Sequence, residues 1–62
     1  MKKTLKLRSV RQKLGVSQVE LARRMGVDQP TVSKWETGAR YPFPHTLGAI
    51  AKALRCAEKE LT

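Results

Sequence analysis

Apolar residues recur along this chain at the spacing of helices rather than of strands. Leu7, Val10 and Leu14 are three and four residues apart, which predicts an amphipathic helix that ends at Gly15. A later stripe of the same kind follows Pro44. Alternation of apolar and polar residues never persists beyond a few positions, so no strand is predicted.

Two helix start signals lie between these stripes. Ser17 is a capping residue, and Glu20 stands three positions later, which predicts a capping box for a helix that runs to about Met25. Asp28 is the second cap, with Pro30 in the first turn of the next helix, where its missing N–H costs little. Gly26 and Gly38 are the expected terminators of these two helices.

The pattern therefore predicts an all-α fold, a compact bundle of about five short helices in one domain over residues 1–62. Residues 39–43 form a loop, and residues 56–62 add a last short turn that ends on Leu61. The expected core consists of Leu7, Val10, Leu14, Leu21, Ala22, Val27, Val32, Trp35, Leu47, Ile50 and Leu54.

The segment 17–37 contains two short helices joined by a tight turn with a glycine. Ala22 is small where the two helices cross, Gly26 takes the turn, and apolar residues fill the seam. The sequence LGVSQVELARRMGVDQPTVSKWETGARYP resembles the DNA-binding domain of phage repressors and Cro proteins, the xenobiotic-response-element family of bacterial regulators. The resemblance covers Leu7 to Leu61. It implies a lambda-repressor-like five-helix domain whose second and third helices form a helix-turn-helix.

The resemblance also implies binding to double-stranded operator DNA, usually as a homodimer. A recognition helix presents its first residues to base edges in the major groove. The Gln29 amide matches adenine N6 and N7, and Lys34 reaches guanine or a phosphate. Ser33 lies on the same face, and Pro30 offers only apolar contact with a thymine methyl group.

Phosphate contacts are expected on the flanks of that helix. By resemblance, Gln18 and Arg40 are phosphate ligands, and Tyr41 and His45 assist Arg40. Thr31 is polar and near the helix start, where it contacts a phosphate or packs its methyl group on thymine. Residues 1–4 form a basic arm.

Three further residues have structural roles. By resemblance, Arg11 on the inner side of the first helix pairs with Glu36 at the end of the recognition helix. Cys56 is expected to pack in the core. The resemblance also indicates that Arg55 and Ala57 replace a helix-ending glycine and a capping residue, which predicts a short fifth helix.

Composition agrees with a nucleic-acid partner. Thirteen Lys and Arg against five Asp and Glu give a net charge of +8, a field that attracts polyanions. One Cys and one His cannot complete a structural zinc site. We expect no metal, no cofactor, no small-molecule ligand and no membrane contact, and a cytoplasmic, nucleoid-associated protein in a bacterial or phage-infected cell.

Three functions fit the sequence. The first is a small Cro-like or repressor-like transcriptional regulator that occupies an operator. The second is a DNA-binding antitoxin whose main partner is a toxin protein. The third is a protein-interaction module without DNA, although a protein interface should show apolar anchors where Gln29, Ser33 and Lys34 are polar. No grouping of residues suggests catalysis, so an enzyme is not expected.

Overall fold

The computed structural model describes residues 5–62, so the basic arm expected at residues 1–4 lies outside the described residues. The five helices of the described part are α1 (Leu7–Lys13), α2 (Gln18–Met25), α3 (Gln29–Thr37), α4 (Pro44–Leu54) and α5 (Glu58–Leu61). The expected all-α bundle is therefore confirmed. No helix in residues 5–62 is both long and apolar enough to cross a membrane.

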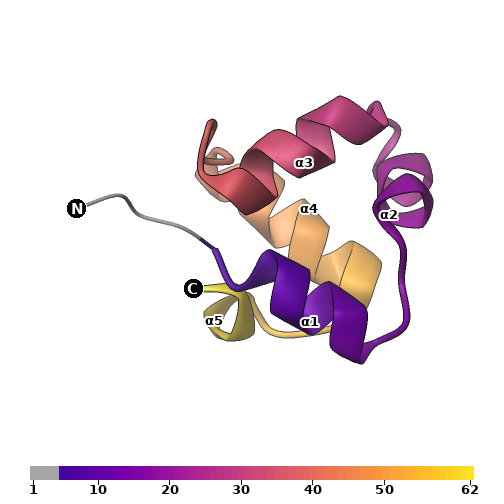
Figure 1. The fold of residues 1–62 in the computed structure, drawn as a ribbon. Helices are drawn as coiled ribbons and strands as arrows, with labels where there is room; N and C mark the ends of the chain where they lie inside the picture. The colour runs from indigo at the N-terminus through magenta and orange to yellow at the C-terminus, as the bar shows by residue number, and fades with distance from the viewer. Residues whose placement is uncertain (1–4) are drawn as a thin grey trace.

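The helices surround one apolar core. Figure 1 shows α3 at one side of the bundle and α1 at the other, with α4 between them in this view. Helix α2 packs on α3 and α4, and α1 packs on α3 and α5. The buried apolar residues are Leu5, Leu7, Leu21, Ala22, Val32, Trp35, Leu47, Ile50, Ala51, Leu54 and Leu61.

The expectation that Leu14 belongs to the core is wrong. Leu14 is 48% exposed, because α1 ends at Lys13 and the chain turns away at Gly15, which has φ +73°. Helical spacing put Leu14 on the apolar face but could not show that no neighbouring helix covers the end of α1. Val10 and Val27 are only partly buried against the core.

The two expected helix caps are present, but the capping box at α2 is incomplete. The Ser17 hydroxyl accepts a hydrogen bond from the Glu20 N–H at 3.0 Å, and Asp28 Oδ1 accepts one from the Thr31 N–H at 3.2 Å. The Glu20 carboxylate does not reach back to residue 17. It binds Arg23 and Arg24 instead, because two guanidinium groups one turn away are stronger donors than one amide.

The turn between α2 and α3 is short because Gly26 adopts a left-handed conformation, with φ 71°. Its neighbour Val27 donates its N–H to the Ala22 carbonyl at 3.0 Å, which closes the end of α2. Ala22 is 4% exposed at the crossing of the two helices. The turn therefore carries the chain directly from α2 into α3.

Helix α5 has four residues, and a hydrogen bond holds each of its ends. Glu60 Oε2 accepts a hydrogen bond from the Ala57 N–H at 2.9 Å and so caps α5 without a capping side chain at residue 57. The Lys6 N–H donates to the Leu61 carbonyl at 2.6 Å, which joins α5 to the start of α1. Leu61 is fully buried.

Arg55 ends α4 in the left-handed region, with φ 57° and ψ 45°, where glycine is favoured. Replacement by glycine should stabilise the domain by about 1 kcal/mol, since the cost of the Cβ at positive φ disappears. Thermal and urea unfolding measure this change. R55A serves as the control because it removes the charge but keeps the Cβ. Equal stability of R55G and R55A would contradict the backbone explanation.

Candidate nucleic-acid interface

The first turn of α3 presents polar side chains on the surface. Gln29 begins the helix directly after its cap, and Gln29, Pro30 and Lys34 are all exposed. Ser33, which the sequence places on the same face, is half-buried. The four residues predicted to contact bases thus lie together along one helix, three of them open to solvent.

A chain of polar side chains runs behind this surface and connects three helices. Arg11 of α1 donates from Nε to Glu36 Oε2 at 2.6 Å and from Nη2 to Oε1 at 3.2 Å. Gln18 of α2 donates from Nε2 to the same Oε1 at 2.9 Å. Gln29 of α3 donates from Nε2 to Gln18 Oε1 at 2.5 Å. The expected Arg11–Glu36 ion pair is present, and it is the inner end of this chain.

The hydrogen bond to Gln18 determines how the Gln29 amide can be used. An amide nitrogen has two hydrogens, and Gln18 takes one of them. The second hydrogen and the carbonyl oxygen of Gln29 remain, which are one donor and one acceptor at the tip of an exposed side chain. This pair matches the N7 acceptor and the N6 donor of adenine.

The hydrogen bond from Gln29 to Gln18 was not predicted from the sequence. Gln18 was expected to bind phosphate, and one hydrogen of its Nε2 is still uncommitted after the bond to Glu36. Its carbonyl oxygen, however, holds Gln29. No periodicity signals such a contact, because it joins the first residues of two different helices.

The inner end of this chain of polar side chains, the Arg11–Glu36 pair, is buried. Only 10% of the Arg11 side chain and 3% of the Glu36 side chain are exposed. Burial by itself raises the pKa of Glu36, but the hydrogen bonds from Arg11 and Gln18 outweigh it, so the pKa of this carboxyl is lowered. Arg11 also donates from Nη1 to the Val16 carbonyl at 2.7 Å, which fixes the loop before α2.

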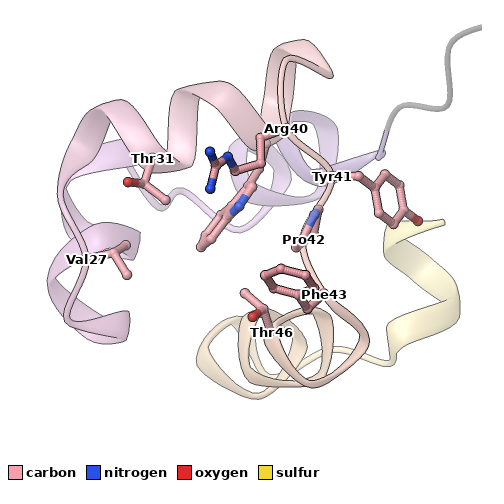
Figure 2. A pocket seen from close by; sticks show the side chains of 8 residues that line it. Val27, Thr31, Arg40, Tyr41, Pro42, Phe43 and Thr46 are labelled. Atoms are coloured by element: carbon pink, nitrogen blue, oxygen red, sulfur yellow. The ribbon is translucent and has the colours of Figure 1, made fainter.

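A hollow of about 320 Å³ lies beside α3, between this helix and the loop that leads to α4 (Figure 2). In Figure 2 the Arg40 guanidinium is turned back toward Thr31, whereas the Tyr41 ring points away from the other labelled side chains. The residues that line the hollow are Val27, Thr31, Trp35, Arg40, Tyr41, Pro42, Phe43 and Thr46. Three of the expected phosphate ligands, Thr31, Arg40 and Tyr41, thus line one concave surface next to α3.

Two of the expected phosphate ligands, Thr31 and His45, already have partners. The Thr31 hydroxyl donates a short hydrogen bond to Asp28, which also lowers the pKa of that carboxyl. A phosphate oxygen would therefore have to take this proton away from Asp28. His45 stacks on Phe43, with ring centroids 5.7 Å apart. Both remain predictions, weaker than that for Arg40, whose side chain is exposed.

The described residues offer little to a metal ion. No group of three or more His, Cys, Asp or Glu side chains gathers anywhere in residues 5–62. Cys56 is half-buried and packs against the core, and burial together with the nearby Glu60 raises the pKa of its thiol. Its environment is that of a packing residue rather than a reactive one.

Two helices, a left-handed glycine turn and an exposed polar first turn define a helix-turn-helix DNA-binding domain. The sequence profile of the helix-turn-helix family matches residues 7–61. The chain therefore belongs to this family, in its phage repressor and Cro-like form. Its members are DNA-binding transcription regulators and not enzymes.

Relatives agree with this assignment. An uncharacterized HTH-type transcriptional regulator of Mycobacterium tuberculosis is 44% identical over 55 residues, which are 89% of this chain and 39% of the relative. Repressor protein C2 of Salmonella phage P22 is 35% identical over 52 residues, 84% of this chain and 24% of that protein. The chain thus spans well under half the length of either. A crystal structure from Bacteroides fragilis matches 94% of each chain with a TM-score of 0.89 and 22% identity, which shows the fold alone.

The Arg11–Glu36 pair should contribute to stability as a unit. Each single substitution, R11M or E36Q, should lower the free energy of unfolding by about 3–5 kcal/mol, because it leaves the other buried side chain without its charged partner. The double variant should cost less than the sum of the two, since neither partner is then left unpaired. Urea unfolding in a stabilising osmolyte measures the cycle. Additive losses would contradict a direct interaction in solution.

The salt dependence of acid unfolding should distinguish this pair from the exposed ion pairs of α2. The lowered pKa of Glu36 means that its contribution is present above the ordinary value of 4.5 and is lost as pH falls through the lowered one. Glu20, between Arg23 and Arg24, has its pKa lowered to about 2 and loses its contribution in the same direction. Salt screens only the exposed pairs effectively.

Unfolding free energies from pH 7 to 3, at low and at high salt, test this difference. E36Q should flatten the pH dependence at both salt concentrations, and E20Q mainly at low salt. If 0.5 M salt abolished the effect of E36Q as well, the carboxyl would not be shielded from solvent.

Proposed function

We propose that this chain binds a specific operator in double-stranded DNA and acts as a Cro-like or repressor-like transcriptional regulator in the cytoplasm. In this proposal α3 lies in the major groove, with Gln29, Pro30, Ser33 and Lys34 facing the base edges. The family supports DNA binding and transcription regulation. The placement of α3 and the roles of single residues are our proposal.

One observation carries it: the Gln29 side chain is exposed and yet held by a hydrogen bond of 2.5 Å to Gln18. A long exposed side chain normally loses rotamer freedom when it binds a partner. Gln18 restrains this amide before DNA arrives. The remaining donor and acceptor are then oriented for one base, and adenine is the base whose major-groove edge they complement.

Contacts to the DNA backbone would secure this position. Arg40 follows α3 and is exposed, and Gln18 begins α2 with one amide hydrogen uncommitted. Phosphate contacts of this kind fix orientation and carry no sequence information. The net charge of +8 favours the approach of the domain to any DNA, and the base contacts then select the site.

We further propose that the DNA-bound form is a homodimer, with the contact built around Phe43 and the segment from Cys56 onward. Phe43 is 66% exposed, a large apolar side chain beside the hollow of Figure 2. An exposed aromatic residue at the rim of an apolar hollow favours self-association. Leu61, the last residue of α5, is buried in the core of its own domain and cannot contribute its side chain.

Substitutions should separate base contacts from phosphate contacts. Q29A should lose about 1–3 kcal/mol per half-site at a single base pair and relax the preference there. R40A should weaken binding to all sequences alike and lower the salt dependence by about one unit of log–log slope per half-site. Binding to the selected site and to each single-base variant of it, at several salt concentrations, measures both effects.

The matched control is Q18A, which removes no charge. Q18A should lower the affinity for DNA and leave its salt dependence unchanged. It should also relax the preference at the same base pair as Q29A, because the Gln29 amide loses the hydrogen-bond acceptor that restrains it. If Q29A kept the full base preference while R40A destroyed it, the loop after α3 would be the reader and α3 would be misplaced.

Dimeric binding should appear in the footprint. At saturation the protein should protect two half-sites about 34 Å apart, one helical turn, the spacing of phage repressors with this motif. F43S should reduce cooperativity between the half-sites while leaving affinity for an isolated half-site almost unchanged. Protection of a single half-site at saturating protein would contradict the dimer.

A further inference from the structure

A second concave surface lies around Leu14, formed by residues other than those proposed to contact DNA. Two hollows meet there, and Leu14 and Arg55 line both of them. One lies among the α1–α2 loop, α2 and the end of α4, and the other lies among α1, residues 55–56 and α5. We call this the Leu14 surface, and it includes Leu14, Val16, Arg23, Arg24, Lys52 and Arg55.

The rim of this surface is cationic, and its acids are already engaged. Glu20 accepts from Arg23 at 2.6 Å and from Arg24 at 2.8 Å. Glu60 caps α5. Among residues 5–62, the side chains of Lys52 and Arg55 make no hydrogen bond or ion pair with another residue. The surface therefore has spare positive charge for an anionic partner.

Part of its floor is apolar, which favours a partner that has apolar as well as charged groups. Leu14 is 48% exposed, and the partly buried Val16 and Ala53 lie in the same hollow. A phosphate group gains nothing from contact with these apolar side chains. A peptide that carries both apolar and acidic side chains would use the floor and the rim together.

The backbone at Arg55 supports the same interpretation. Glycine would relieve the positive φ of 57°, yet this position carries an arginine, which borders both hollows. A residue kept in a costly conformation next to a concave surface points to a function for its side chain. A cation that contacts an incoming carboxylate is such a function.

We propose that the Leu14 surface docks an acidic, amphipathic segment of a partner protein. An apolar side chain of that segment fills the hollow beside Leu14, and its carboxylates pair with Lys52 and Arg55. This inference goes beyond DNA binding and does not depend on it, because the surface contains none of the proposed DNA contacts.

The test uses a synthetic 15-residue peptide with glutamates on one helical face and leucines on the other. Fluorescence anisotropy gives its affinity for the full chain, and amide chemical shifts map where it binds. The shifts should cluster at residues 13–16 and 52–56. L14S and R55G should each weaken binding about fivefold or more, the change that corresponds to about 1 kcal/mol.

R55G is expected to fold at least as stably as the parent, so lost peptide binding would not reflect unfolding. K59Q is the matched control, since it removes one charge outside both hollows and should leave the affinity unchanged. DNA affinity, measured on the same variants, reports separately on the proposed operator binding.

Three results would overturn the proposal. The first is a set of peptide shifts centred on α3, which would indicate nonspecific attraction to the most exposed polar helix. The second is equal binding of a control peptide whose leucines are glutamines. The third is a short DNA duplex that shifts residues 13–16 and 52–56, which would make this a nucleic-acid surface.

Discussion

The Glu36 carboxylate is the point on which the arrangement of the first three helices depends. It belongs to α3, pairs with Arg11 of α1 and accepts from Gln18 of α2. Burying two charges costs several kcal/mol each, and the cost is offset here because both carboxylate oxygens are hydrogen-bonded and Arg11 has a further acceptor, the Val16 carbonyl. No buried side-chain polar atom within residues 5–62 lacks a partner.

This constraint links stability to recognition. Tight turning at Gly26 brings the starts of α2 and α3 together, so that Gln18 can bond to Glu36 on one side and to Gln29 on the other. Part of the ordering of the Gln29 amide, which we propose contacts a base, then occurs when the domain folds rather than when it binds DNA. A small core is sufficient for such a site because the hydrogen bonds from Arg11 and Gln18, rather than additional apolar packing, orient α3, the helix that we propose reads the bases.

Much of the fold follows from local signals in the sequence, and the errors arise where local signals end. Caps and turns at Ser17, Asp28 and Gly26 depend on neighbouring residues only, so the bounds of α2 and α3 were predictable. Leu14 was misplaced because periodicity says which face is apolar, not how far the neighbouring helices extend. Leu5 lies outside any helix and has no periodic partner, so its burial gave no sequence signal. The contact between Gln18 and Gln29 depends on how two helices cross, which the spacing of residues does not specify.

If the hydrogen bonds from Glu36 through Gln18 orient Gln29, then Glu36, although remote from the DNA, should affect base preference. The measurement compares discrimination between adenine and each other base at the Gln29 position for the parent, E36Q, Q29A and the double variant, at a temperature where all are folded. E36Q should reduce discrimination in the parent background and have no further effect when Gln29 is absent. A uniform loss of affinity in E36Q, with discrimination intact, would show that Gln29 is oriented without these hydrogen bonds.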